Sequence, residues 1–293
     1  MKKRTAFSAF EFSVVIAIIG FLMVGTVKGF GMVNASRLQS AQALTLSSPV
    51  ANIKGLSLWL ETTLEDSFLT TETYDRTQLT TWKDINPQAT TKYTATTTAS
   101  SGITYKALSD IYKVPAIYFN GTNTAVLTIT DVVGATPLFT PDNAFSFFIV
   151  SKLNDGPASN KIIFSNGDAS AWGFGLVGSQ GSRTRRFIFT GGSDVDSATT
   201  TASTNAEVIS ATYEGGTSGA IKLFTNGAAE TLASSTATAP SPATGFYIGN
   251  KSLGSPWTGY IAEIIIFKRV LSDYDRKQVE KYLGQKYGIR VVS

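Results

Sequence analysis

The sequence predicts an α+β chain in which a long N-terminal helix is followed by an antiparallel β-sandwich and a short C-terminal helix. Three observations predict this class. No proline occurs between Phe7 and Leu46, and apolar residues dominate that segment as far as Val33. Short alternating or apolar runs separated by turn residues then continue to about residue 259. The chain closes with a strand and a helix that has both start and stop signals.

The composition excludes several classes of chemistry. The 293 residues include no cysteine and no histidine, which excludes a disulfide framework, thiolate chemistry and the commonest metal ligand. The net charge is +4, and Lys2, Lys3 and Arg4 supply three of those charges. The one dense basic cluster contains Arg183, Arg185 and Arg186, and a solvated loop is preferred there over an anion site. We therefore expect no nucleic-acid partner.

The N-terminal segment carries an acidic residue in an unfavourable place. Glu11 stands before a run from Phe12 to Val27 that has no charge, and a carboxylate at the centre of a bilayer costs about 2.5–3.5 kcal/mol. A secretory signal peptide needs a small-residue cleavage site just after the apolar run, and the nearest one, Ala41-Gln42-Ala43, lies too far past it. A plain transmembrane anchor fits the length of the run. Neither explains Glu11, since both would be more favourable without it.

The segment FSAFEFSVVIAIIG resembles the N-terminus of type IV prepilins. Phe7 matches the family's mature N-terminal phenylalanine, Glu11 its glutamate, and Val14–Gly20 its apolar stretch. The resemblance implies removal of a leader, residues 1–6, by prepilin peptidase between Ala6 and Phe7, followed by N-methylation of Phe7. The sequence departs from the family at Ala6, where glycine is usual, and in lacking a C-terminal disulfide.

Filament assembly gives Glu11 a physical role. When apolar helices bundle and exclude water, each new amino terminus at Phe7 becomes a buried cation, and Glu11 of a neighbouring copy can pair with it. Gly20, Gly25 and Gly29 also lie in this segment. Two explanations of these glycines remain open, both linked to assembly: close helix packing through the spacing of Gly25 and Gly29, or local unwinding as in pilins of this family.

The region from about residue 50 to residue 259 predicts many short strands. Turn signals between them include Asn120-Gly121, Asn166-Gly167, Gly191-Gly192 and Asn226-Gly227. Such a pattern, with few helical stretches, is typical of an antiparallel sandwich. The runs that we expect to form strands are Ala125–Ile129, Phe145–Val150, Lys161–Phe164, Arg186–Phe189, Val208–Tyr213, Ile221–Phe224 and Phe246–Ile248.

The C-terminal region predicts a strand and then a helix. Tyr260–Phe267 is the strand, and Ser272 begins a helix cap with acidic residues in the first turn. Val279, Tyr282 and Leu283 form its apolar face. Gly288 ends the helix.

Motifs after residue 50 resemble the laminin-G-like, concanavalin-A-like domains of bacterial surface proteins. The order and spacing of these motifs agree with the family, which implies a jelly-roll sandwich with the last helix packed at its edge. The resemblance extends over residues 50–293, the segment that we take as the head. The motifs are GLSLWLE at 55–61, Trp82-Lys83-Asp84, PAIYFNGTN at 115–123, FSFFIVSK at 145–152 and the tail 257–289.

The head lacks the pattern of a hydrolase. Related glucanases place their carboxylates on one strand as E-x-D-x-x-E, and the nearest acidic group, Glu61 with Glu65 and Asp66, has the wrong spacing. We therefore expect no enzyme.

Trp172, in the glycine-rich SAWGFG segment, is the candidate sugar platform, with packing in the core as the preferred alternative. Trp59 and Trp257 are assigned to the core.

No cofactor is expected, with calcium kept as an alternative because loop aspartates are calcium ligands in some laminin-G-like domains. No D-x-D-x-D-G-like loop is present, so turn formation is the preferred role of these aspartates. They are Asp131, Asp155, Asp168, Asp194 and Asp196.

Together these features predict a structural subunit of a type IV pilus-like filament with a lectin-like head for adhesion. Residues 7–49 form the assembly or transmembrane helix. The expected partners are further copies of the chain, prepilin peptidase, the pilus assembly machinery and surface glycans. The expected location is the inner membrane before assembly and the bacterial surface afterwards. Two alternatives remain: a pseudopilin of a type II secretion system, and a membrane-tethered carbohydrate-binding module.

Overall fold

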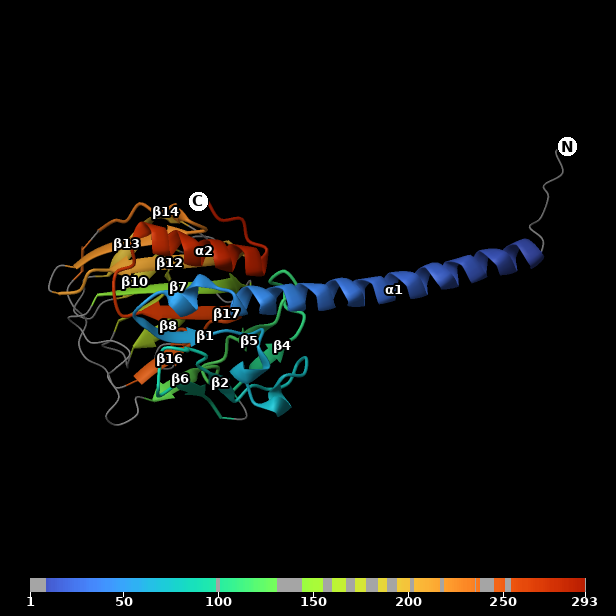
Figure 1. The fold of residues 1–293 in the computed structure, drawn as a ribbon, viewed down its shortest axis with the longest axis horizontal. Helices are drawn as coiled ribbons and strands as arrows, with labels where there is room; N and C mark the ends of the chain where they lie inside the picture. Colours follow the sequence, from blue (N-terminus) through green and yellow to red (C-terminus); the bar gives the residue numbers. More distant parts are fainter. Residues whose placement is uncertain are drawn as a thin grey trace.

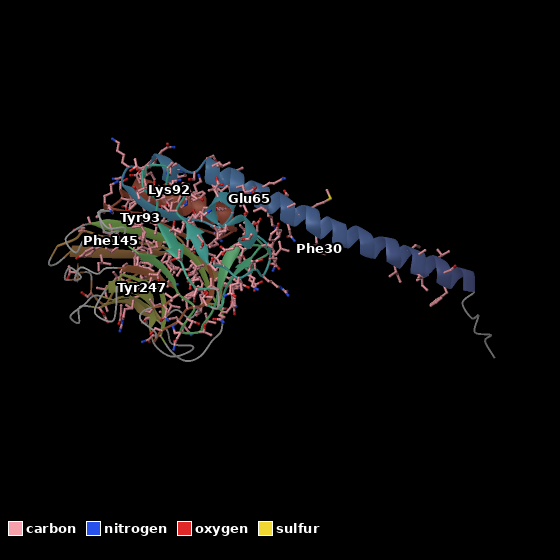
Figure 2. The ribbon with its side chains drawn as sticks, turned by 90° about the horizontal axis from the view of Figure 1, so that it is seen from below. Phe30, Glu65, Lys92, Tyr93, Phe145 and Tyr247 are labelled. Atoms are coloured by element: carbon pink, nitrogen blue, oxygen red, sulfur yellow. The ribbon has the colours of Figure 1, made fainter. Side chains whose placement is uncertain are left out.

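A β-sandwich head and one projecting helix make up the protein (Figure 1). The computed structural model describes residues 9–98, 101–130, 144–154, 160–166, 172–177, 184–188, 194–200, 203–216, 219–234, 236–237, 245–250 and 254–292. Helix α1 (Ala9–Leu46) enters the head at its C-terminal end, and its N-terminal end lies far from the sandwich. Phe30 lies on the part of α1 outside the head (Figure 2).

The predicted fold class, α+β with a long pilin-type helix, is wrong, although its β-sandwich part is confirmed. The described head is mostly β. Within the described residues, no helix is both long enough and apolar enough to cross a membrane. The turns of α1 after Val33 carry Arg37 and Gln39, so the helix is not apolar along its whole length. The last turns of α1 instead pack against the head, where Ala41 and Thr45 are buried.

Two antiparallel sheets form the sandwich in the described part of the chain. In the first sheet, the main path runs β14 (Ala228–Ala229), β13 (Gly219–Thr225), β12 (Ala206–Tyr213), β7 (Phe145–Leu153), β17 (Thr258–Phe267), β5 (Ala116–Asn120) and β4 (Ile103–Lys106). Two further strands join it, β1 (Leu56–Leu60) beside β17 and β15 (Thr236–Ala237) beside β13. The second sheet runs β11 (Val195–Thr200), β10 (Thr184–Ile188), β9 (Trp172–Val177), β8 (Lys161–Asn166), β16 (Gly245–Ile248), β6 (Leu127–Thr130), β3 (Thr94–Thr96) and β2 (Thr81–Lys83).

Strand β17 organises the first sheet. One of its edges pairs with β7 along nearly its whole length, while its other edge is shared by β5 and β1. The short element η1 (Pro49–Asn52) connects α1 to β1, and η2 (Glu65–Ser67) and η3 (Thr70–Glu72) lie between β1 and β2 of the second sheet. The chain therefore brings the end of α1 beside its last strand and last helix.

The first sheet is covered on both faces, which explains the continuous apolar character of its central strands. On β7, Phe147 and Ile149 point into the core between the sheets, while Phe148 and Val150 point toward the helices. Successive side chains of a strand face opposite sides, so a strand covered on both sides needs apolar residues throughout. Helix α2 (Asp273–Tyr287) and the end of α1 form that second cover (Figure 1).

Strands predicted from the sequence are confirmed, as is the C-terminal helix. Each predicted run overlaps an observed strand, with bounds that differ by a few residues. The Ser272 hydroxyl accepts a hydrogen bond from the Asp275 N–H, and Gly288 closes α2 with φ of 62°. The Asn226-Gly227 turn is also confirmed, with φ of 50° and 80°. Gly167, Gly191 and Gly192 of the other predicted turns lie outside the described residues.

Candidate functional site

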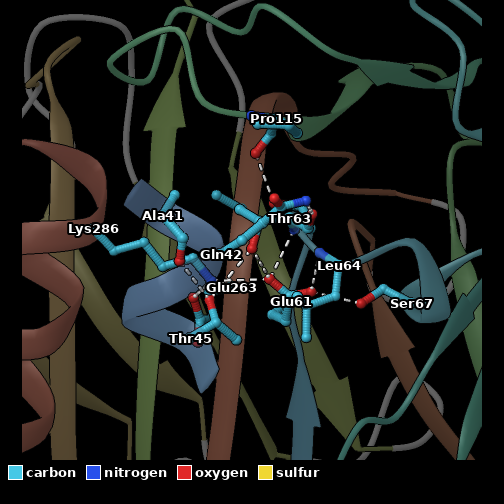
Figure 3. Close-up of polar contacts among 12 residues, drawn as sticks. Ala41, Gln42, Thr45, Glu61, Thr63, Leu64, Ser67, Pro115, Glu263 and Lys286 are labelled. Atoms are coloured by element: carbon cyan, nitrogen blue, oxygen red, sulfur yellow. Dashed lines mark hydrogen bonds and ion pairs between the residues drawn. The ribbon is translucent and has the colours of Figure 1, made fainter. Parts of the chain in front are cut away.

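A buried ionic cluster lies where α1 meets the head (Figure 3). The Lys286 Nζ lies 2.9 Å from Glu61 Oε2 and 2.8 Å from Glu263 Oε2. All three side chains have an exposed fraction of 0%. A cation thus bridges two carboxylates within an interior where an unpaired charge is strongly unfavourable.

Three elements distant in sequence supply these side chains. Glu61 follows the last residue of β1, and Lys286 belongs to the last turn of α2. Glu263 lies on β17, directly after a register shift between Ile261 and Glu263. A bulge of this kind changes which face of the sheet the following side chains occupy. Glu263 therefore lies on the side of the first sheet that the helices cover, where its carboxylate is within reach of Lys286.

Neighbouring donors satisfy the carboxylate of Glu61. Its oxygens accept hydrogen bonds of 2.7 Å from the N–H and the hydroxyl of Thr63, from the N–H of Leu64 and from the hydroxyl of Ser67. The turn after β1 therefore wraps around the carboxylate (Figure 3). Charge-assisted bonds of this number hold an anion in place without access to water.

Aromatic donors surround Glu263. The indole Nε1 of Trp59 donates to Oε1 at 2.7 Å, and the hydroxyls of Tyr282 and Tyr287 donate at 2.9 Å. The Trp59 and Tyr282 rings meet edge to face, with centroids 6.5 Å apart. Tryptophan and tyrosine here fill volume and also satisfy a buried charge.

Helix α1 joins the same network. The Gln42 side-chain amide donates to the Thr63 carbonyl at 3.0 Å, and the hydroxyls of Thr45 and Thr63 lie 3.3 Å apart. Tyr282 also lies within 3.4 Å of the Thr45 hydroxyl. The junction between the helix and the head is therefore polar and specific, in addition to the apolar packing of Ala41.

The electrostatics favour the charged forms of the pair. Burial by itself would raise the pKa of Glu61, but Lys286 and the donors of Thr63 bring that pKa below its usual value. Burial would likewise lower the pKa of Lys286, but Glu263 and Glu61 raise it overall. Burial, and then the charge of Glu263, raises the pKa of Tyr282 and Tyr287 well above the usual value. Both tyrosines consequently remain protonated donors.

This cluster is suited to a structural role and not to glycoside hydrolysis. A glycosidase needs two carboxylates that reach the bond of a bound substrate, whereas Glu61 and Glu263 are enclosed and already paired with Lys286. The arrangement fixes the end of α1 against β1, β17 and α2. In the sequence, Glu61 stands out only as part of an acidic group, and the cluster is not predicted. A signal for it exists, since Glu263 interrupts the apolar run YIAEIIIF.

The predicted assembly residues that the structure describes belong to α1. Ala6 and Phe7 are outside the described residues, and the side chains of Glu11, Gly20 and Gly25 are not described, although these residues belong to α1. Gly29 lies in open space, because a Cβ built there meets nothing within 4 Å.

Large apolar side chains remain uncovered on the same helix. The most exposed of the first turns is Phe12, with an exposed fraction of 63%. The other large apolar side chains on α1 with high exposure are Val14, Val15, Ile16, Ile18, Ile19, Phe30, Met32, Val33 and Leu46. Apolar exposure of this kind, in the described turns of α1, marks a surface that associates with another apolar surface.

The other sequence candidates are tryptophans and aspartates of the head. Trp172 begins β9, and its side chain lies outside what the structure describes. Trp59 and Trp257 are buried, which confirms their assignment to the core. Asp131, Asp155 and Asp168 are outside the described residues. Asp194 and Asp196 both pair with Arg186, and no group of three acidic residues able to hold a metal ion occurs in the described segments.

The basic cluster differs from the predicted solvated loop. Arg185 and Arg186 lie on β10, and Arg183 is outside the described residues. The Arg185 guanidinium is buried and lies 2.7 Å from Glu207 and 2.5 Å from Glu230. The loop interpretation is therefore wrong for Arg185 and Arg186. Arg186 pairs with Asp196 on the neighbouring strand β11, and Arg185 pairs with Glu207 on β12 of the first sheet and with Glu230.

Comparison with known families agrees with this architecture. A laminin G model described as the concanavalin A-like lectin/glucanases superfamily matches residues 120–275, just over half of the chain. No match was found among curated protein sequences.

Solved structures share the fold at low sequence identity. The binding domain of paraclostridial mosquitocidal protein 1 is 13% identical with a TM-score of 0.54, over 78% of this chain and 52% of that one. Trypanosoma rangeli sialidase in complex with 2,3-difluoro-KDN is 13% identical with a TM-score of 0.54, over 90% of this chain and 40% of that one. The chain thus spans about half or less of these structures, and the likeness is one of fold.

Proposed function

Because this chain belongs to the concanavalin A-like lectin/glucanases superfamily, we propose that its head binds carbohydrate and that helix α1 joins copies of the chain into a surface filament resembling a type IV pilus. The single observation that carries the proposal is the shape of the molecule: a lectin-like sandwich at one end of a projecting helix that bears uncovered apolar side chains (Figure 1). The helix provides association, and the head provides recognition.

Two features support association through α1. Phe12, Ile16 and Ile19 are exposed in the single chain. Burying them between copies stabilises the assembled state by about 25 cal/mol per Å² of apolar surface removed from water. The buried junction of Lys286, Glu61 and Glu263 also holds α1 firmly against the head, so that assembled helices would carry the heads in a fixed orientation.

The sequence around Phe7 supports a processed filament subunit over a simple tether. In the proposal, prepilin peptidase removes residues 1–6, Phe7 is methylated, and Glu11 pairs with the Phe7 amine of an adjoining copy. A pseudopilin would share these steps and differ in not forming long surface filaments. A tethered module would require neither processing nor Glu11.

Intact-mass measurement of the chain purified from its own cells tests the processing step. The expected mass lacks residues 1–6 and includes one methyl group. Electron microscopy then tests assembly: Glu11→Ala should reduce surface filaments, whereas Glu214→Ala, an exposed head residue, should leave them unchanged. Retention of residues 1–6 in assembled filaments overturns the proposal.

Glycan binding is tested separately with the full-length chain on a glycan array. The proposal expects a subset of glycans to be retained above the background given by a heat-unfolded sample. If no glycan is retained, the head is not a carbohydrate-binding module, whatever the outcome of the filament experiments.

A further inference from the structure

A surface cleft separates η1 from the first turns of α2 and has a volume of about 590 Å³. This volume is in the range of small-molecule sites, about 300–1,000 Å³. The cleft lies on the helix-covered side of the first sheet and is separate from the buried ionic cluster. Its polar and aromatic lining residues are Asn52, Lys54, Arg269, Tyr274, Asp275 and Gln278.

Arg269 is held in place within this cleft. Its Nε donates to the Lys54 carbonyl at 2.8 Å, and its Nη2 donates to Asp275 Oδ2 at 3.0 Å. Gly55, at φ of 88°, lets the arginine stem pass closely, because a Cβ there would lie 3.3 Å from the Arg269 Cδ. Nη1 makes no hydrogen bond to the described residues, so a pre-oriented guanidinium keeps a donor for a ligand.

Tyr274 provides an uncovered aromatic face. Its exposed fraction is 72%, although it lies on a helix whose other aromatic side chains, Tyr282 and Tyr287, are buried. Gln278 follows four residues later and so lies on the same face of α2. A ring with an apolar body and a polar tip is the kind of side chain enriched at binding surfaces.

The charge of the cleft is unbalanced. Arg269 and Lys54 are cationic, and Asp275 is the one carboxylate among the lining residues of this described cleft. Asp275 is already paired with Arg269, whereas Lys54 has no ion-pair partner within the described part of the chain. The cleft therefore favours an anion beside an aromatic ring.

We propose that this cleft binds a sugar residue that carries a carboxylate, as a uronic or sialic acid does. The sugar ring lies on Tyr274, the carboxylate pairs with Lys54 and Arg269 Nη1, and the side-chain amides of Asn52 and Gln278 meet ring hydroxyls. This inference rests on the proposed carbohydrate-binding function and specifies one of its subsites and its ligand class.

Binding of matched glycans to the immobilised full-length chain tests the inference. One pair is polygalacturonate and its fully methyl-esterified form, and the other is sialyllactose and lactose; each pair differs in the acidic group. We expect the acidic member of at least one pair to bind, its neutral counterpart to bind at least about tenfold more weakly, and 0.5 M salt to weaken the acidic interaction. The pair that responds identifies the source of the acid.

Variants locate the subsite. Tyr274→Ala and Lys54→Gln should each weaken acidic-glycan binding about tenfold or more, and both positions are exposed, so the fold is retained. Tyr74→Ala is the matched control, because Tyr74 is also an uncovered tyrosine, with an exposed fraction of 70%, and lies elsewhere on the head. It should bind as the unmodified chain does.

Each outcome has a distinct meaning. Acidic glycans that bind equally to the unmodified chain and to Tyr274→Ala overturn this subsite and leave the proposed function intact. Equal binding of acidic and neutral members overturns the ligand class. Absence of binding to every glycan overturns the carbohydrate-binding function and the subsite together.

Discussion

Lys286 is the residue on which the helix–head junction depends. Replacing it with methionine leaves Glu61 and Glu263 as two buried carboxylates without a cation. We expect Lys286→Met to lower the free energy of unfolding by about 3–5 kcal/mol, because breaking a buried pair leaves an uncompensated charge. Chemical denaturation followed by tryptophan fluorescence measures this change, since Trp59 contacts Glu263.

An exposed ion pair offers the matched control. Lys113 lies 3.2 Å from Asp110, and both side chains are about half exposed. Lys113→Met should change the free energy of unfolding by no more than about 1 kcal/mol. Equal effects of the two substitutions would contradict a special role for burial at Lys286.

The pH dependence of stability follows from the same residues. The pKa of Glu61 is below its ordinary value of 4.5, so its contribution to stability is present above pH 4.5 and is lost as the pH falls through the lowered value. The pKa of Lys286 is above its ordinary value of 10.5, so its contribution is present below pH 10.5 and is lost as the pH rises through the raised value. The contribution of Glu61 and Lys286 to the unfolding temperature should therefore be constant between these two pH limits and should fall outside them. Glu61→Gln should remove its part of the acid-side loss.

Single residues were predictable where one chemical property decides their environment. Trp59 and Trp257 are large and apolar, and their burial follows from that property. Arg185 was expected in a solvated loop, the sequence made no prediction for Lys286, and both charges are buried. Their burial depends on carboxylates that the fold brings from other elements, and no local pattern records such a partner.

At the scale of elements, the β13–β14 hairpin tests how a turn fixes its surroundings. Gly227 has φ of 80°, and a Cβ there would lie 2.1 Å from the Val292 carbonyl oxygen. Asn226 accepts the Val292 N–H through its own carbonyl at 2.8 Å. Gly227→Ala should therefore lower the free energy of unfolding for two reasons. Alanine in the left-handed conformation costs about 1–2 kcal/mol, and its Cβ would also displace residues 291–292.

Gly216 separates these two contributions. Its φ is 79°, but a Cβ there meets nothing within 4 Å. Gly216→Ala should thus show the conformational strain alone, and its free energy of unfolding should fall less than that of Gly227→Ala. Equal losses, measured by urea denaturation, would show that residues 291–292 move aside without cost.

Elements were predictable where local signals are strong. The cap at Ser272, the stop at Gly288 and the Asn226-Gly227 turn each depend on a few adjacent residues. The pairing of β1 with β17 is different, because it joins segments about 200 residues apart and is decided by packing of the whole sandwich. The apolar run of β7 indicated a strand but could not indicate which layers cover its two faces.

The whole molecule combines a rigid head with a projecting helix, and the junction makes them one unit. Apolar packing at Ala41 and hydrogen bonds from Gln42 and Thr45 fix the last turns of α1, while the earlier turns extend away from the sandwich (Figure 2). The polar cluster that receives the end of α1 was not predicted from the sequence, since its members come from the end of β1, from β17 and from α2.

The exposed apolar turns of α1 lead to a prediction about self-association. Phe12, Ile16 and Ile19 lie within two turns of one another, with exposed fractions of 63%, 54% and 47%. Replacing all three with serine removes apolar surface that two or more copies would bury together, at about 1.5–3 kcal/mol for each side chain fully buried. We expect the triple variant to sediment as a smaller species than the unmodified chain at equal concentration in the same mild detergent.

Leu108→Ser is the control, because Leu108 is similarly exposed, at 52%, but lies on the head, and it should not change the sedimentation. Because α1 joins the head only through its last turns, near-ultraviolet circular dichroism of the triple variant should retain the signal of the buried aromatic core. An unchanged distribution of species in the triple variant would mean that copies associate through the head, and the proposed role of the helix in assembly would then fail.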